Sequence, residues 1–438
     1  MSDLASSTSG LRELHPPLSE HEALVESARC LMCFDAPCTH ACATHIDIPK
    51  FIKKINTGNL RGSARTIFES NLLGATCARV CPVQELCEGA CVLGSEHKPI
   101  AIGRLQRYAM DHAYSKKSEF FRPAATTGRK IAVVGAGPAG LSCAGELAKL
   151  GHSVTLFERR DLAGGLSTYG IISLREPVEV ALMEVSMIQK LGVRLETTKE
   201  VGFDPTVTEL RENFDSVFLG VGLGHTPQLG IAGEEYILDG LQYIEGSKLL
   251  PSRLRVGRNV IVIGAGNTAI DCATIARRMG AERVTMIYRR TENEMTAYPH
   301  EYDFVKREGV AFWFLAQPIK VHHENGAVKA LECVRMALGE PDPSGRPSPQ
   351  PLPDSNMLLP ADQIVKAIGQ HKPSIAQLLN LKTDKGFIEV SENFETSFPG
   401  IFAGGDCIRA RGAASTVMAV QDGKLAARAI HQRLVNHG

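Results

Sequence analysis

The strongest constraint on the fold is a glycine-rich turn between an apolar strand and a helix, which occurs twice. The first copy is KIAVVGAGPAGLSCAGELAKLGHSVTLFE at residues 130–158, and the second is NVIVIGAGNTAIDCATIARRMGAERVTMIYRR at residues 259–290. Each reads as strand, turn, helix and second strand, the unit that builds parallel sheets with crossover helices. The copies begin about 130 residues apart, too far for a solenoid repeat of about 20–50 residues. We therefore predict an α/β protein with two Rossmann-like domains.

The first turn has the GxGxxG pattern of a dinucleotide site. Its first glycine allows a tight turn, the second lets the backbone approach a pyrophosphate, and the third lets the helix pack closely on the strand. A carboxylate ends the second strand, 18 residues after the last glycine, where it can accept hydrogen bonds from ribose hydroxyls. The predicted site residues are Gly135, Gly137, Pro138, Ala139, Gly140 and Glu158.

A distant segment, residues 395–427, resembles the closing segment of flavoproteins that have two dinucleotide domains. Its strand GIFAGGD ends at Asp406, and a helix is expected to begin near Ala414. The resemblance implies that the aspartate binds FAD and that the helix N-terminus, with its partial positive charge, points at the flavin. The expected site residues here are Gly405, Asp406, Ala414, Ser415 and Thr416. The alternative for Asp406 is a plain turn residue at the end of a strand.

The second turn has the related GxGxxA pattern, in Gly264, Gly266, Asn267, Thr268 and Ala269. Its second strand ends in Arg289 and Arg290, where an NAD-selective site usually carries an acid. Two guanidinium groups can pair with a 2′-phosphate, which favours NADPH over NADH. Alternatively, the arginines only solvate the strand end, or a carboxylate elsewhere or a flexible loop lets both cofactors bind.

The twelve cysteines are unevenly distributed, and eight of them fall between residues 30 and 91. They form the runs Cys30-x2-Cys33-x4-Cys38-x3-Cys42 and Cys77-x3-Cys81-x5-Cys87-x3-Cys91. Eight thiolates are enough for two 4Fe-4S clusters. Zinc is the alternative, but it favours paired CxxC motifs, and only one CxxC occurs here. The other four cysteines read as small buried hydrophobic residues.

Composition excludes several classes of partner. Lys plus Arg and Asp plus Glu number 48 each, so no net charge attracts the chain to nucleic acid or to a membrane. No apolar run is long enough to cross a membrane, and the N-terminus lacks the pattern of a signal peptide. We therefore expect a cytoplasmic protein. A Pro-rich stretch at residues 339–356 is expected to form a surface loop or hairpin.

The combined motifs resemble the glutamate synthase small subunit family. They are RCLMCFDAPCTHAC, CARVCPVQELCEGAC, IAIGRLQRY, VVGAGPAG, GGL, IGAGNTA, YRR and AGGD. Within that superfamily, CFDAPC and GGLST are most similar to the N-terminal half of dihydropyrimidine dehydrogenase and to the separate bacterial subunit that corresponds to it. The resemblance adds Gly165, Leu166 and Arg175 to the expected flavin site, and Ala367, Ile368 and Gly369 to the nicotinamide site. After GGL the chain reads YGIISLREP, whereas relatives commonly read YGIPxFRLP, so the loop there is expected to differ.

The resemblance also changes the cluster ligands that spacing suggests. It implies that the two runs interleave, with one cluster on Cys30, Cys33, Cys38 and Cys91, and the other on Cys42, Cys81, Cys87 and Gln106. Spacing alone favours Cys77 as the last ligand of the second cluster. The resemblance makes Cys77 a bystander.

The resemblance implies a glutathione-reductase-like arrangement preceded by an α-helical iron-sulfur domain. We expect the helical domain with two 4Fe-4S clusters at residues 1–125, the FAD domain at residues 126–225 and 372–438, and the NAD(P)H domain at residues 226–371. No protein side chain is expected to act as a catalytic acid, base or nucleophile, because the flavin carries the hydride transfer.

The expected function is oxidation of NAD(P)H and transfer of the electrons to a partner subunit. The leading hypothesis is the electron-input subunit of a dihydropyrimidine dehydrogenase, with an FMN-containing partner that reduces uracil or thymine. The alternative is a glutamate synthase small subunit. A third reading is a non-catalytic scaffold that binds a partner, and the intact glycine turns and cysteines argue against it.

Overall fold

The structure is a computed structural model, and it describes residues 13–342, 345–409 and 415–436. The chain divides into two compact units. One contains residues 14–168, 175–224 and 372–438, and the other contains residues 1–13, 169–174 and 225–371. The domain limits expected from the sequence stay predictions.

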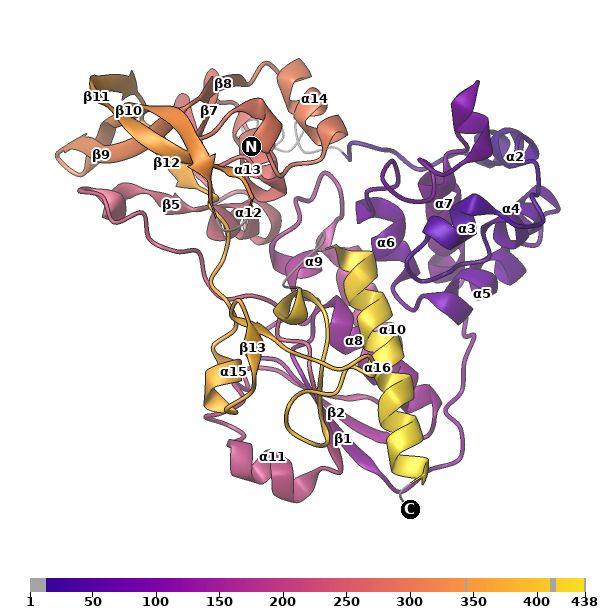
Figure 1. The fold of residues 1–438 in the computed structure, drawn as a ribbon. Coiled ribbons are helices and arrows are strands. Elements are labelled where there is room, and N and C mark those ends of the chain that lie inside the picture. Colours follow the sequence, from indigo (N-terminus) through magenta and orange to yellow (C-terminus); the bar gives the residue numbers. More distant parts are fainter. Residues whose placement is uncertain (1–12, 343–344, 410–414, 437–438) are drawn as a thin grey trace. The chain divides into compact units, whose positions relative to one another are not determined.

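The first unit begins with a helical segment (Figure 1). Helix α4 shows how the sequence builds it: Asp47 caps the helix by accepting a 3.1 Å hydrogen bond from the backbone N–H of Lys50. One face of this helix, with Phe51 and Ile52 at its centre, is fully buried. The elements of this segment are α2 (Glu20–Ala28), α3 (Pro37–Ala41), α4 (Ile48–Asn56), α5 (Leu60–Ser70), α6 (Gly74–Val80), η2 (Val92–Ser95) and α7 (Ile102–Ser115).

A five-stranded parallel sheet of order β15-β4-β1-β2-β3 forms the core of the rest of this unit. Four consecutive residues of β1 are buried, as is usual for a parallel strand covered on both faces. The elements are β1 (Lys130–Val134), α8 (Pro138–Lys149), β2 (Ser153–Phe157), α9 (Leu166–Tyr169), α10 (Val178–Lys190), β3 (Arg194–Glu196), α11 (Val207–Asn213), β4 (Ser216–Leu219), α15 (Ile375–Leu378), β13 (Thr383–Asp384), β14 (Phe387–Ile388), β15 (Ile401–Ala403), η5 (Asp406–Ile408) and α16 (Thr416–Asn436).

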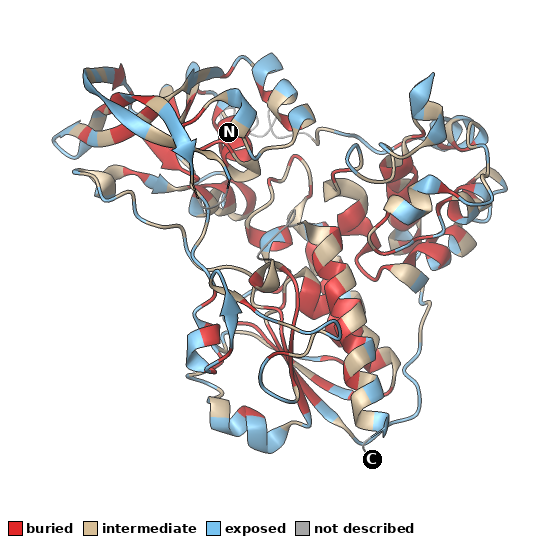
Figure 2. Cartoon of the chain, viewed as in Figure 1, coloured by how far each residue is buried: buried red, intermediate tan, exposed pale blue. Residues whose placement is uncertain are grey.

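The last helix, α16, packs against α8 (Figures 1 and 2). The two backbones approach so closely that a Cβ added to Gly423 would lie 2.1 Å from the carbonyl oxygen of Ala139. The Ser142 hydroxyl donates a 2.7 Å hydrogen bond to the carbonyl oxygen of Val420. This contact holds the end of the chain on the helix that follows the first glycine-rich turn.

Two buried charged side chains join the sheet part of this unit to the helical segment. Glu184 of α10 accepts hydrogen bonds from the backbone N–H groups of Ala75 (2.7 Å) and Thr76 (3.3 Å), at the start of α6. Lys424 of α16 donates to the carbonyl oxygens of Thr44 (2.9 Å) and Ser70 (2.8 Å). Burial raises the pKa of Glu184 to about 8 and lowers the pKa of Lys424 to about 8.

The second unit contains a parallel sheet of order β5-β12-β6-β7-β8 and an antiparallel sheet of order β11-β10-β9. The expected excursion at residues 339–356 is a hairpin that contains the end of β10 and most of β11. The elements are η3 (Glu234–Tyr236), β5 (Leu238–Asp239), α12 (Gly240–Leu249), β6 (Asn259–Ile263), α13 (Asn267–Arg278), β7 (Arg283–Tyr288), η4 (Glu292–Glu294), α14 (Pro299–Arg307), β8 (Ala311–Phe314), β9 (Ala316–Glu324), β10 (Ala327–Pro341), β11 (Pro347–Pro360) and β12 (Gln363–Lys366).

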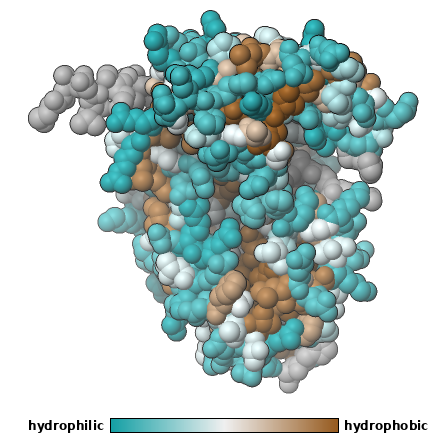
Figure 3. All heavy atoms as spheres, turned by 90° about the vertical axis from the view of Figure 1, so that its left-hand side faces the viewer, coloured by the Kyte–Doolittle hydropathy of each residue, from teal (hydrophilic) through white to brown (hydrophobic). Residues whose placement is uncertain are grey.

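One face of the molecule is mainly hydrophilic. On the face drawn in Figure 3, hydrophobic residues gather in separate patches within a largely hydrophilic surface. Of the helices in the described ranges, none is both long enough and apolar enough to span a bilayer.

The close approach of α16 to α8 gives a stability prediction. Substitution Gly423→Ala places a methyl group against the Ala139 carbonyl oxygen, and we expect it to cost about 1–3 kcal/mol of folding free energy. The matched control is Gly246→Ala in α12, where the new Cβ would meet a Leu254 methyl carbon at an ordinary 3.4 Å. Thermal unfolding monitored by circular dichroism should show a lower melting temperature for Gly423→Ala only. A melting temperature of Gly423→Ala equal to that of the wild type would contradict the close approach of the two helices.

Candidate functional site

The first glycine-rich turn follows β1 and has a shape that only glycine permits. Gly135 has a φ of +93°, and a Cβ there would lie 2.5 Å from the carbonyl oxygen of Gly220. A Cβ on Gly140 would lie 1.8 Å from the carbonyl oxygen of Gly135. The turn therefore stays close to both the neighbouring strand and its own helix, as a dinucleotide site requires.

The turn exposes the N-terminus of α8. Gly137 is the N-cap residue, Pro138 is the first helical residue and Ala139 follows it, and no side chain caps the helix. The backbone N–H groups of the first turn are thus available to an anionic group. This local geometry fits the pyrophosphate of a dinucleotide.

Glu158 follows β2 beside this turn, and its carboxylate is held in place. Its side chain is buried. One carboxylate oxygen accepts a 2.9 Å hydrogen bond from the backbone N–H of Ala136, and the other accepts a 2.9 Å hydrogen bond from the backbone N–H of Arg160. Each carboxylate oxygen can accept more than one hydrogen bond, so Glu158 can still accept from ribose hydroxyls.

The GGL loop lies against the same turn. The backbone N–H of Gly164 donates a 2.8 Å hydrogen bond to the carbonyl oxygen of Ala136. A Cβ on Gly165 would lie 2.7 Å from the Cα of Gly137. Leu166 is exposed next to this contact, and Arg175 is half-buried further along the chain. The loop and the turn therefore form one surface.

The closing segment reaches this surface from the far end of the chain. Gly405 has a φ of +80°, and a Cβ there would lie 3.0 Å from the Cβ of Ala139. Desolvation raises the pKa of the next residue, half-buried Asp406, although Arg409 opposes the shift. The buried carboxylate of Asp422 accepts a 2.9 Å hydrogen bond from the backbone N–H of Gly405.

The start of α16 differs slightly from the expectation. The helix is described from Thr416, and Ser415 caps it by accepting a 3.4 Å hydrogen bond from the backbone N–H of Met418. The expected site residue Ala414 lies outside the described residues.

The second glycine-rich turn lies in the other unit and is built in the same way. Gly264 has a φ of +131°, and a Cβ there would lie 2.2 Å from the carbonyl oxygen of Ala367. Ala367 is followed by Ile368 and Gly369, the other two residues that the family resemblance assigns to the nicotinamide site. The segment that contains these three residues therefore lies directly beside the GxGxxA turn. Gly266 is the N-cap residue of α13, and no side-chain hydrogen bond caps this helix.

The three residues that follow Gly266 begin α13. The Asn267 side-chain oxygen accepts a 3.1 Å hydrogen bond from the backbone N–H of Tyr298, Thr268 is half-buried, and Ala269 is fully buried. Asn267 thus connects this turn to the segment before α14. The small Ala269 side chain lies 3.4 Å from the position that a Gly264 Cβ would take, which shows how closely helix and turn pack.

The two arginines at the end of β7 are placed differently. Arg289 is exposed. Arg290 is buried, its guanidinium pairs with Asp342 (2.7 Å), and it also donates a 2.8 Å hydrogen bond to the carbonyl oxygen of Pro347. Arg290 therefore holds the tip of the β10–β11 hairpin, and of the two arginines Arg289 is the one that is exposed to a ligand.

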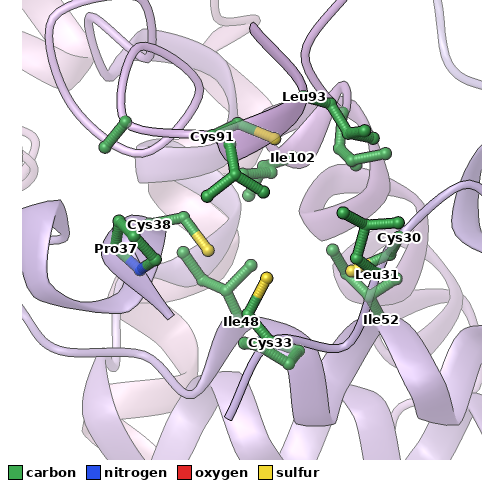
Figure 4. Close-up of a pocket in the computed structure, with 14 residues that line it drawn as sticks. Cys30, Leu31, Cys33, Pro37, Cys38, Ile48, Ile52, Cys91, Leu93 and Ile102 are labelled. Atoms are coloured by element: carbon green, nitrogen blue, oxygen red, sulfur yellow. The ribbon is translucent and has the colours of Figure 1, made fainter. Parts of the chain in front are cut away.

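Four cysteines of the helical segment surround one pocket (Figure 4). The sulfur atoms of Cys33, Cys38 and Cys91 face a common space, and Cys30 lines it as well. The empty space amounts to about 380 Å³, part of it open to solvent, and the other lining side chains are apolar. These cysteines are the set that the family resemblance groups together.

A second pocket of about 390 Å³ contains the other predicted set. It is lined by Cys42, Cys81, Cys87 and Gln106, and also by Cys77. The residues between the two runs of cysteines thus fold so that the runs interleave. Ile48 lines both pockets, and Val417 of α16 lines the second one.

The amide of Gln106 is oriented by a hydrogen bond. Its nitrogen donates a 2.7 Å bond to the carbonyl oxygen of Gly74. The amide oxygen is therefore the atom that is left to coordinate a metal. Cys77 is fully buried and hydrogen bonds to Cys81, which raises the pKa of the Cys81 thiol well above its usual value.

The thiols need a cation in order to ionise together. Burial raises the pKa of Cys38 to about 11, and the neighbouring Cys30 and Cys91 raise it further. Burial also raises the pKa of Cys87. Metal binding requires thiolates, and a bound metal would supply the positive charge that offsets their repulsion. No three His, Cys, Asp or Glu side chains of the described residues converge closely enough to hold a single metal ion.

No pattern in the sequence indicated three of the side chains that lie around these sites. Thr44 lies 3.4 Å from the sulfur of Cys42, Asn71 lines the second pocket, and Asp342 pairs with Arg290. Asn71 and Asp342 belong to no recognisable motif, and they meet the sites only through the fold. Only contacts between distant segments reveal them.

Two family descriptions match the sequence. Residues 7–118 match "Dihydropyrimidine dehydrogenase domain II, 4Fe-4S cluster", and residues 115–423 match "Pyridine nucleotide-disulphide oxidoreductase". These matches confirm the predicted family resemblance, the fold class and the predicted cofactors, namely FAD, 4Fe-4S and NAD(P)H.

Several curated proteins are similar over most of the chain. The NADP(+)-dependent formate dehydrogenase subunit beta of Moorella thermoacetica is 37% identical over 91% of this chain, which spans 60% of that protein. The glutamate synthase [NADPH] small chain of Escherichia coli K12 is 35% identical, with 95% of this chain and 93% of that protein covered. The NAD-dependent dihydropyrimidine dehydrogenase subunit PreT of the same organism is 32% identical, with 97% of each covered.

Solved structures support the fold. FprA of Mycobacterium tuberculosis in complex with NADPH matches 70% of this chain and 85% of its own, with a TM-score of 0.57 and 18% identity. Thioredoxin reductase of T. acidophilum matches 70% of this chain and 99% of its own, with a TM-score of 0.53 and 20% identity.

The grouping of the cysteines gives a prediction. Substitution Cys38→Ser should lower the iron content and the broad visible absorbance of the clusters, because it removes a thiolate from the first pocket. Bound FAD should remain. The control is Cys333→Ser, since Cys333 is buried in the other unit and lines neither pocket. Iron and acid-labile sulfide analysis checks the result. Unchanged iron in Cys38→Ser would contradict the assignment.

Proposed function

Because the chain belongs to the pyridine nucleotide-disulphide oxidoreductase family and carries a 4Fe-4S domain of the dihydropyrimidine dehydrogenase type, we propose that it is the electron-input subunit of a two-subunit dihydropyrimidine dehydrogenase. The observation that carries this proposal is the pair of motifs CFDAPC and GGLST, together with a match to PreT over 97% of both chains. The partner would be an FMN-containing subunit that reduces uracil or thymine. We place this complex in the cytoplasm.

When bound, FAD accepts two electrons from NAD(P)H and releases them one at a time to iron-sulfur clusters. The residues of this chain bind and orient these groups. The uncapped N-terminus of α8 would hold the pyrophosphate of FAD, and Glu158 would hold its ribose. The N-terminus of α16 would stabilise negative charge on the flavin through the helix dipole.

We further propose that the two cysteine pockets hold one 4Fe-4S cluster each. Cys30, Cys33, Cys38 and Cys91 would bind the first cluster, and Cys42, Cys81, Cys87 and Gln106 would bind the second. The orientation of the Gln106 amide supports its role, because the amide oxygen is left for the metal. Val417 of α16 lines only the second pocket, which supports electron entry there.

A second candidate is the small subunit of a glutamate synthase. The glutamate synthase small chain is 35% identical to this chain, slightly more than PreT at 32%. The two candidates share the cofactors and differ in the partner subunit and in the final acceptor. The identities of this protein's partner and substrate therefore decide between them.

Purification of the complex tests the choice. We expect the tagged chain, purified from its own cells, to bring down an FMN protein, and the complex to form dihydrouracil from uracil with NADPH or NADH. The same complex should form no glutamate from glutamine and 2-oxoglutarate. Glutamate formation by a glutaminase-bearing partner, without uracil reduction, would contradict the dihydropyrimidine dehydrogenase proposal and support the second candidate.

The position of Arg289 predicts the nucleotide preference. We propose that its guanidinium binds the 2′-phosphate of NADPH, so Arg289→Ala should weaken NADPH binding about tenfold or more, since a hydrogen bond to a charged group contributes about 1.5–3 kcal/mol. NADH binding should change little. Dissociation constants from fluorescence titration of the full chain check this.

The matched control is Arg283→Ala, because Arg283 is exposed at the opposite end of the same strand, β7. It should leave the affinity for both nucleotides unchanged. Equal weakening of NADPH and NADH by Arg289→Ala would argue against a 2′-phosphate contact. Arg290→Ala should weaken NADPH binding as well. This substitution removes the ion pair between Arg290 and Asp342, and a carboxylate without that pair disfavours binding of the 2′-phosphate nearby.

A further inference from the structure

We propose that Asn71 donates a hydrogen bond from its side-chain amide to a sulfur atom of the cluster in the second pocket, and that this bond raises the reduction potential of that cluster. The inference rests on the proposed function insofar as that function places a cluster between Cys42, Cys81 and Cys87. Asn71 itself is not a metal ligand in this proposal. Its effect on the reduction potential of the cluster comes from this one hydrogen bond.

The backbone around Asn71 fixes where its side chain lies. Asn71 directly follows α5, and its backbone N–H donates a 2.9 Å hydrogen bond to the carbonyl oxygen of Ile67. Its side-chain oxygen accepts a 2.8 Å hydrogen bond from the backbone N–H of Leu73. The residue is 1% exposed. It is therefore held between α5 and α6 and cannot turn to solvent.

The same hydrogen bond fixes which end of the amide is the donor. A backbone N–H requires an acceptor, so the amide oxygen faces Leu73 and the nitrogen, Nδ2, faces away from it. This nitrogen is buried and has no hydrogen-bond partner in the part of the chain that the structure describes. A buried donor without a partner costs about 1–3 kcal/mol. A partner supplied by a bound group would remove this cost.

The lining of the second pocket indicates what that partner is. Asn71 lines the pocket together with Cys42, Cys77, Cys81 and Cys87. A group that is bound by these thiolates is rich in negatively polarised sulfur, which accepts hydrogen bonds. An amide N–H group suits such an acceptor, whereas a carboxylate would repel it.

A second donor lies beside the same pocket. The hydroxyl of Thr44 is 3.4 Å from the sulfur of Cys42, and a metal-bound thiolate can only accept that hydrogen bond. In the first pocket, by contrast, every lining side chain other than the cysteines is apolar. Side-chain donors are thus concentrated at the second pocket.

The sign of the effect follows from charge. Reduction adds an electron to the cluster and makes its sulfur atoms more negative, so a hydrogen bond to sulfur stabilises the reduced form more than the oxidised form. Removal of the donor should therefore shift the midpoint potential of this cluster to a more negative value. The potential of the other cluster should stay the same.

The experiment uses the full chain loaded with FAD and clusters. Asn71→Asp keeps an oxygen that can accept from Leu73 and replaces the donor nitrogen. We expect a redox titration followed by electron paramagnetic resonance to show a negative shift for one cluster only. The matched control is Asn59→Asp, because Asn59 caps α5 through its side-chain oxygen (2.9 Å to the backbone N–H of Gly62) and is exposed. It should shift neither potential.

A second measurement does not depend on the variant's folding or on its added charge. The wild-type chain is labelled with ¹⁵N in the side-chain amide of asparagine only, reduced, and examined by pulsed electron paramagnetic resonance. Asn71 is the one asparagine among the lining residues of either pocket. We expect a ¹⁵N coupling to one cluster.

The outcomes separate this inference from the proposed function. Two clusters in the wild type without a ¹⁵N coupling, or unchanged potentials in Asn71→Asp, would overturn the role of Asn71 alone. A wild-type chain that holds no cluster after reconstitution would overturn the cluster assignment itself, and the inference with it. A coupling together with a negative shift confined to one cluster supports the inference.

Discussion

The arrangement of the unit that contains the first glycine-rich turn depends on the packing of α16 against α8. A single helix at the end of the chain contacts the helix that follows the first glycine-rich turn, and Gly423 makes the approach possible. One residue earlier, Asp422 accepts a hydrogen bond from the backbone of Gly405, and one residue later, Lys424 donates to the helical segment. Residues 422–424 of this helix thus contact the end of β15, the helix that follows the first glycine-rich turn, and the helical segment that contains the cysteines.

The junction with the helical segment uses buried ionisable side chains rather than apolar contact alone. Glu184 and Lys424 reach the segment from α10 and α16, and each is satisfied by backbone groups of the segment. Burial shifts the pKa of each side chain toward its neutral form. An unpaired charge at such a place would be costly, so these contacts select one orientation of the segment. Val417 consequently lines the second cysteine pocket.

Local patterns in the sequence predicted the two glycine-rich turns, and the reason is physical. Gly135, Gly140 and Gly264 shape turns of a few residues, and their requirement for glycine depends on the adjoining strand and helix. By contrast, the role of Arg290 depends on Asp342, which a hairpin brings back to the end of β7. The two arginines therefore look equivalent in the sequence but differ in burial. Asn71 likewise belongs to no motif, because its contact with the pocket arises from the packing of α5 and α6.

The two cysteine pockets use the same kind of ligand in different surroundings. The first has an apolar lining, which disfavours added negative charge. The second has buried hydrogen-bond donors, and one thiolate is replaced by the neutral amide of Gln106 in the proposed assignment. Both differences lower the cost of an extra electron at the second pocket. An electron would then be held more tightly in the second pocket, which Val417 of α16 also lines, than in the first, so onward transfer would require a partner whose own acceptor has a higher affinity for electrons.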